Sequence, residues 1–165
     1  MASERFVAAL TEQIAREFAA AHQYVAIGNY YSAETFPQLT AFFYDQAEEE
    51  REHAMKMVNY LIDRGVQPDI GGVESPKGSF GDHVEPIRHA LEQERQVTIK
   101  ISELFEIARE TRDYASEQFM QWFVEEQVEE EAAMGDLLAV AERTVSVPML
   151  LEEYLARDKP GARPD

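Results

Sequence analysis

Residues 46–57 read QAEEEREHAMKM, and the pair Glu50 and His53 within this stretch decides the fold. Both lie in a stripe of helical period whose other members are Leu39, Phe43, Gln46, Met57 and Leu61. Side chains three residues apart share one face of a helix. The sequence therefore predicts a helix that points a carboxylate and an imidazole into a hydrophobic core.

The same arrangement occurs twice in the chain. Each copy is a lone carboxylate followed 33 residues later by a pair at i and i+3: Glu17 with Glu50 and His53, and Glu94 with Gln127 and Glu130. The two copies are offset by 77 residues. One Glu from each of two helices, with an i,i+3 pair from each of the other two, is the ligand pattern of a four-helix bundle that holds two metal ions.

The hydrophobic period predicts an all-α protein and no strands. We expect a single domain over residues 1–165, with a four-helix bundle over about 3–143, a short fifth helix over about 147–157 and a flexible tail over 158–165. Residues 66–82 contain prolines and glycines and read as a loop. Extended, a loop of this length reaches roughly 55 Å, which is enough to cross the bundle and make the second and third helices parallel.

Composition limits the possible partners. The formal net charge of −17 and pI near 4.5 argue against nucleic acid and anionic membranes, and suit a protein that handles cations. No cysteine is present, so disulfides, zinc ribbons and iron–sulfur clusters are not expected. The first residues do not resemble a signal peptide, and no apolar run reaches about 18 residues. We therefore expect a cytoplasmic protein.

Metal explains the carboxylates that interrupt the apolar stripes. A Glu on a helix is usually solvated, but Glu17, Glu50, Glu94 and Glu130 each lie within the stripe of their own helix, and the stripes contain no Lys or Arg. Buried like charges would take up protons or destabilise the core unless cations lie between them. Carboxylate oxygens with one imidazole suit iron or manganese better than copper.

The two copies differ in their donors, since His53 in the first is matched by Glu130 in the second and Glu50 by the neutral amide of Gln127. We predict a tighter site at Glu17, Glu50 and His53. A weaker site is expected at Glu50, Glu94 and Glu130, with Glu50 bridging the two.

Four motifs resemble those of prokaryotic non-haem ferritins, and the likeness covers nearly the whole chain: EQIAREFAAAHQYVA at 12–26, QAEEEREHAMKMV at 46–58, ALEQER at 90–95 and QFMQWFVEEQVEEE at 118–131. The resemblance implies a homo-oligomeric cage of 24 subunits that stores and detoxifies iron. It also implies a ferroxidase centre that oxidises Fe(II) with dioxygen or hydrogen peroxide and feeds a ferric oxyhydroxide mineral.

The resemblance also assigns residues. Glu17, Glu50 and His53 would form one iron site, and Glu94 and Glu130, with Gln127 close by and Glu50 shared, the other. A third iron site would use Glu49, Glu126, Glu129 and Glu130, although a solvated inner face explains the first three equally well. Tyr24 would be a hydrogen-bonded phenol that can give up an electron; a buried Tyr with a satisfied hydroxyl is the alternative.

Related families fit less well. A bacterioferritin would have a second Glu-x-x-His in the fourth helix and a haem-ligating Met between the Glu and His of the first pair; here these positions hold Gln127, Glu130, Arg51 and Glu52, so no haem is expected. Two other functions remain open. One is a di-iron oxidase or peroxidase without mineral storage, and the other is a metal-free helical scaffold.

Overall fold

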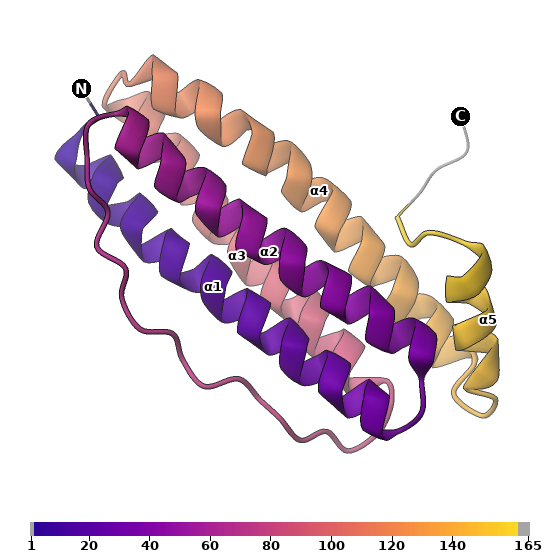
Figure 1. Cartoon of the computed structure of the whole chain (residues 1–165). Helices are drawn as coiled ribbons and strands as arrows, with labels where there is room; N and C mark the ends of the chain where they lie inside the picture. Colours follow the sequence, from indigo (N-terminus) through magenta and orange to yellow (C-terminus); the bar gives the residue numbers. More distant parts are fainter. Residues whose placement is uncertain (1, 162–165) are drawn as a thin grey trace.

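The computed structural model describes residues 2–161, and every regular element in that range is a helix, as the sequence predicted (Figure 1). The elements in chain order are α1 (Glu4–Ala33), α2 (Pro37–Asp63), α3 (Glu85–Glu110), α4 (Tyr114–Arg143) and α5 (Met149–Arg157). None of these helices is both long enough and apolar enough to span a membrane.

Four long helices form the bundle in two antiparallel hairpins, α1 with α2 and α3 with α4. The segment 64–84 connects the two hairpins and runs along the outside of the bundle from one end to the other, so α2 and α3 are parallel (Figure 1). This long crossover confirms the connection expected from the loop length. Close backbone contacts join α1 to α2, α3 to α4 and α1 to α3, whereas α2 and α4 stay farther apart.

Most helix ends follow local sequence signals. Gly65, just after α2, adopts φ +76°, the left-handed conformation that glycine tolerates best. Asp113 caps α4 by accepting a hydrogen bond from the Ser116 N–H at 3.2 Å. The third helix begins at Glu85, three residues after Asp82. The carboxylate of Asp82 still accepts the Glu85 N–H at 2.8 Å, so it satisfies a donor at the helix start from a turn that precedes the helix.

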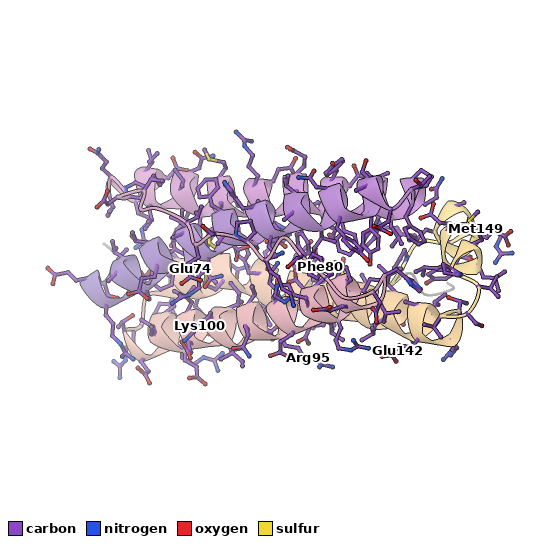
Figure 2. The ribbon with its side chains drawn as sticks, turned by 90° about the horizontal axis from the view of Figure 1, so that it is seen from below. Glu74, Phe80, Arg95, Lys100, Glu142 and Met149 are labelled. Carbon is purple, nitrogen blue, oxygen red and sulfur yellow. The ribbon has the colours of Figure 1, made fainter. Side chains whose placement is uncertain are left out.

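The crossover is fastened to the bundle by specific contacts. The Gln23 side chain donates to the Lys77 carbonyl and accepts from the Lys77 N–H, both at 2.9 Å. Tyr31 donates its hydroxyl to the His83 carbonyl at 2.6 Å. Figure 2 shows Phe80 on this segment, where its ring lies 5.3 Å from that of Tyr30. These contacts hold residues 77–83 against the bundle, whereas residues 69–76 are exposed.

Helix α5 lies across one end of the bundle and caps α2. No side chain caps α2 from its own N-terminus. Instead the buried carboxylate of Glu152 accepts the N–H groups of Gln38 at 2.8 Å and Leu39 at 2.9 Å. These donors would otherwise be left unsatisfied at the helix start.

The sequence predicted a flexible tail over 158–165, of which 158–161 is described and 162–165 lies outside the described residues. The described part packs against α4. Pro160 is buried, and the Gly161 N–H donates to Asp136 at 3.2 Å.

Two apolar clusters fill the bundle, one on each side of a polar layer. One cluster includes Tyr24, Phe43 and Leu137, and the other includes Leu10, Met57 and Phe123. Along every long helix the metal-ligand candidates lie between the members of these two clusters. The fold therefore places the candidate site at mid-height, enclosed by apolar residues above and below.

Candidate metal centre

Six predicted site residues converge from four helices into this polar layer. They are Glu17, Glu50, His53, Glu94, Gln127 and Glu130, and none is more than 5 % exposed. The repeat read from the sequence is thus realised in space, with each i,i+3 pair directed inward.

The layer contains two groups of donors spaced for metal ions, and Glu50 belongs to both. In the first, His53 Nδ1 lies 3.8 Å from Glu17 Oε2 and 3.6 Å from Glu50 Oε2. In the second, Glu50, Glu94 and Glu130 each place one oxygen within 4.8 Å of the others. Shared membership puts Glu50 where a carboxylate that bridges two ions would lie.

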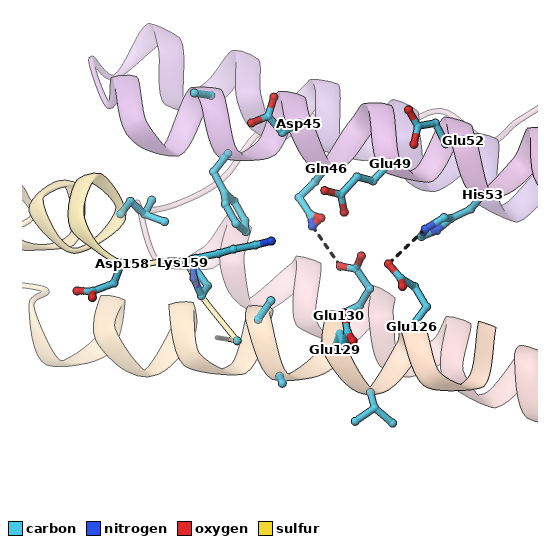
Figure 3. A pocket seen from close by; sticks show the side chains of 18 of the residues that line it. Asp45, Gln46, Glu49, Glu52, His53, Glu126, Glu129, Glu130, Asp158 and Lys159 are labelled. Carbon is cyan, nitrogen blue, oxygen red and sulfur yellow. Dashed lines mark hydrogen bonds and ion pairs between the residues drawn. The ribbon is translucent and has the colours of Figure 1, made fainter. Parts of the chain in front are cut away.

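A third group opens onto the surface. His53 Nε2 lies 3.6 Å from Glu126 Oε1, and these two residues with Glu130 form a further metal-spaced triad. The triad faces a groove between α2 and α4 with a volume of about 1390 Å³ (Figure 3). Glu49 and Glu129 also line this groove but are exposed, outside the triad. The structure thus groups Glu126 and Glu130 with His53, and places the other two candidates at the rim.

Basic side chains lie along the groove. Figure 3 shows Lys159, from the segment after α5, extending over the groove toward Gln46 and Glu130. Lys56, on α2, places its ammonium 3.4 Å from the centre of the Trp122 ring. That ring is 37 % exposed and lies edge-on to the His53 imidazole, at 5.5 Å between centres. Trp122 therefore packs against the outer side of the metal centre.

Buried hydrogen-bond donors hold the carboxylates. The amide of Gln13 donates to Glu17, that of Gln46 to Glu130 and that of Gln127 to Glu94. Tyr24, fully buried, donates its hydroxyl to the other oxygen of Glu94. Sequence reasoning did not single out Gln13 and treated Gln46 only as part of a stripe. For Gln13 the available signal was position, since it lies four residues before its partner Glu17, whereas the partner of Gln46 lies on another helix and gave no such signal.

Burial and mutual repulsion raise the pKa of three carboxyls in the layer. Burial, then the charges of Glu94 and Glu17, holds the pKa of Glu50 well above its usual value. Burial, then the charges of Glu94 and Glu49, raises the pKa of Glu130 to about 9. Burial also raises the pKa of Glu94, although hydrogen bonds from Tyr24 and Gln127 work against it.

The pKa values of Glu17 and His53 shift in the directions expected of an ion pair, downward for the carboxyl and upward for the imidazole. Burial raises the pKa of Glu17, but hydrogen bonds involving His53, Glu50 and Gln13 outweigh it and leave this pKa below its usual value. Burial lowers the pKa of His53, and interactions with Glu17 reverse the effect, so the net shift is upward. Neither oxygen of Glu50 meets a donor.

These donors suit hard cations. The layer offers carboxylate oxygens and one imidazole nitrogen on side chains that are almost fully buried, a set that favours iron or manganese over softer metals. The proton on Glu130, whose pKa is raised to about 9, must leave before its oxygens bind metal, and the raised pKa of Glu50 opposes metal binding in the same direction. The arrangement can therefore hold two ions that share Glu50, with a more open cluster of carboxylates beside them.

Comparison with known proteins agrees with this geometry. The model of the ferritin-like domain family matches residues 7–144. Ferritin BfrB of Mycobacterium tuberculosis is 46 % identical over 154 residues, covering 93 % of this chain and 85 % of that protein. A bacterial non-heme ferritin of Staphylococcus aureus is 42 % identical, covering 80 % of each chain. A structure described as an open pore ferritin from Archaeoglobus fulgidus superposes with a TM-score of 0.91 at 31 % identity, covering 96 % of this chain and 99 % of that one.

Proposed function

The chain belongs to the ferritin family, and from this premise we propose that it stores and detoxifies iron as a ferroxidase. Fe(II) is the substrate, dioxygen or hydrogen peroxide the oxidant, and a ferric oxyhydroxide mineral the product. The proposed assembly is a hollow homo-oligomer of 24 subunits, as the resemblance to non-haem ferritins implies.

One observation carries the proposal: two buried groups of metal-spaced donors share Glu50. Carboxyl groups this deeply buried destabilise a core unless they are paired. Lys56 and Lys159 lie along the groove, outside the buried layer, so they do not supply that pairing. Cations that enter and leave the layer supply it.

In the proposed reaction, Glu17, Glu50 and His53 hold one Fe(II), and Glu50, Glu94 and Glu130 hold the second. Each ion gives one electron to the oxidant; with dioxygen, the electron pair and two protons from water yield hydrogen peroxide. Fe(III) is a harder and stronger acid than Fe(II), so its bound water loses protons and the ions hydrolyse to oxyhydroxide. Displaced ferric ions then pass to the carboxylates of the groove, where Glu49, Glu126 and Glu129 form the proposed third site with Glu130.

The two metal positions differ in whether their carboxylate oxygens already accept hydrogen bonds. Glu17 has one unpartnered buried oxygen and Glu50 has two. Both oxygens of Glu94 accept hydrogen bonds, from Tyr24 and Gln127. We therefore propose that the Glu17 position fills first and that Glu94 must exchange a hydrogen bond to complete the second. Tyr24 donates a hydrogen bond to Glu94, a proposed metal ligand, and is therefore placed to supply an electron. If its role is only structural, no tyrosyl radical forms during Fe(II) oxidation.

The test adds excess Fe(II) in air to metal-free protein and follows iron and protein together through a size-exclusion column. Many irons per subunit eluting with a very large particle support storage. About two irons per subunit on a small oligomer would move the function to a di-iron oxidase. Substituting Glu50→Ala or His53→Ala should slow Fe(II) oxidation strongly with helix content preserved, and unchanged oxidation would overturn the site.

The groove is the observation that favours the second candidate, a di-iron oxidase or peroxidase, because such an enzyme needs space for a substrate beside the metals. Its lining near the centre is ionic, including Glu49, Glu126 and Glu129. Carboxylates that meet open solvent suit hydrated cations better than an organic substrate. The groove therefore supports the passage of iron more strongly than the binding of a second substrate.

A further inference from the structure

Three of the four carboxylates in the two buried groups are held by a glutamine amide. The distances are 2.7 Å from Gln13 Nε2 to Glu17 Oε1, 3.1 Å from Gln127 Nε2 to Glu94 Oε2 and 3.1 Å from Gln46 Nε2 to Glu130 Oε2. All three glutamines are buried, with exposures of 0 %, 4 % and 6 % for Gln13, Gln127 and Gln46. We call these contacts the amide clamps.

Glu50 is the exception. Its side chain is 1 % exposed, yet no donor in the part of the chain that the structure describes lies within hydrogen-bond distance of either carboxylate oxygen. Glu50 is also the member common to both groups. A carboxylate that bridges two ions uses both oxygens, so a clamp on Glu50 would compete with its function.

A clamp occupies one oxygen and fixes the other. With Oε1 of Glu17 held by Gln13, its Oε2 is left unpartnered and directed to His53 Nδ1 at 3.8 Å. The remaining rotation of the carboxylate is then restricted, and the free oxygen is presented to the metal position. Partners of this kind tune metal affinity even though they do not touch the ion.

We propose that Gln13 and Gln46 are positioning residues of the centre, Gln13 for the metal position at Glu17 and Gln46 for the positions that use Glu130. The clamps leave Glu50 as the one carboxylate of the two groups free to bridge. This inference rests on the proposed function and adds to it the residues that orient the ligands.

The side-chain amides of Gln13 and Gln46 destabilise the fold in one respect, which packing alone does not explain. The carbonyl oxygens of Gln13 and Gln46 are buried and have no hydrogen-bond partner among residues 2–161. A buried acceptor without a partner destabilises the fold, whereas an apolar side chain of similar length would avoid this cost. Gln46 is also one of the residues that line the groove.

The test measures Co(II) binding to metal-free protein by the visible absorption of the bound ion, which requires no oxidation. The variants are Gln13→Met and Gln46→Met, which keep the length of the side chain and remove the donor. Gln23→Met is the matched control: Gln23 is also buried, at 6 % exposure, but its amide bonds the Lys77 backbone rather than a carboxylate. Gln13→Asn and Gln46→Asn, which keep an amide too short to reach, replace any Met variant whose circular dichroism shows lost helix.

We expect Gln13→Met to weaken the first-filled position by about 10- to 100-fold and to leave the second unchanged. Gln46→Met should weaken the second and spare the first, and Gln23→Met should alter neither. Two results would overturn the inference without affecting the proposed metal centre. In one, Gln13→Met and Gln46→Met bind Co(II) with wild-type affinity at both positions; in the other, these two variants and Gln23→Met are weakened equally. A wild-type protein that binds no Co(II) would instead overturn the proposed centre, and the clamps with it.

Discussion

Metal binding should expel protons from the buried centre, and the number should fall by one when Glu130 is replaced by Gln. In the metal-free protein at pH 7, Glu130 retains its proton because burial and the nearby carboxylates raise its pKa to about 9. The pKa of Glu50 is also held well above its usual value, by burial and by the charge of Glu94, so a proton there opposes metal binding in the same direction. Glu130 therefore contributes about one released proton per subunit when the metal position that uses it fills.

The raised carboxyl pKa values also determine how strongly, and in which direction, metal affinity depends on pH. A proton that must leave before the metal binds lowers the apparent affinity about tenfold for each pH unit below the pKa of its group. Between pH 8 and pH 6, both below the pKa of Glu130, this residue alone should therefore weaken binding about 100-fold. Affinity rises with pH because the competing proton is lost. Glu130→Gln weakens binding at every pH but reduces the slope of log affinity against pH by about one.

Isothermal titration with Zn(II), which is redox-inert, measures this directly. Titrations at pH 7 in two buffers of different ionisation enthalpy give the number of protons released per ion bound. Glu125→Gln is the matched control, because Glu125 lies on the same helix but is exposed. If the wild-type protein releases no protons, or Glu130→Gln releases as many as wild type, the buried carboxyls are already ionised and the reasoning from burial fails.

Three further predictions concern other contacts of the fold. Glu152→Ala should lower the free energy of unfolding by about 1–3 kcal/mol in denaturant titrations, because it leaves the first N–H groups of α2 without an acceptor; alanine at the exposed neighbour Glu153 should change it by less than about 0.5 kcal/mol. Asp113→Ala should cost about 1–2 kcal/mol at pH 7 by the same assay. Burial raises the pKa of Asp113, but bonds from Ser116 and Arg64 outweigh it and lower that pKa, so the difference between Asp113→Ala and wild type should vanish as the pH falls through it. Lys159→Met should raise the affinity of the groove for Tb(III) about two- to fivefold at low ionic strength, followed by terbium luminescence, with Lys159→Arg as the control; an unchanged affinity would show that the ammonium does not compete there.

The architecture was predictable because it depends on spacing along the chain. Helical period and the 77-residue offset between copies require only that each helix be regular. Gly65 and Asp113 act through local backbone geometry, so their roles as C-terminal and N-terminal caps were readable from sequence. The crossover followed from length alone, since a segment shorter than the bundle could not have joined parallel helices.

Contacts between helices were the part that spacing could not predict. Gln46 and Glu130 are 84 residues apart, and their hydrogen bond depends on the rotation of α2 against α4 and on the rotamers of both side chains. Glu152 reaches α2 from a short helix whose docking has no signature in the sequence. The packed segment 158–161 also went unforeseen, because its polar, proline-containing composition is typical of mobile ends.

The centre was visible in the sequence because it breaks a rule of stable folding, and the structure shows how far it does so. The polar layer divides what would otherwise be one continuous core into two apolar clusters. Within it, both oxygens of Glu50 and one of Glu17 are buried without partners. Selection for stability alone would replace such a layer with apolar residues. Its retention therefore indicates a use that operates only when cations occupy it, and the residue left least satisfied, Glu50, is the one that both metal positions would share.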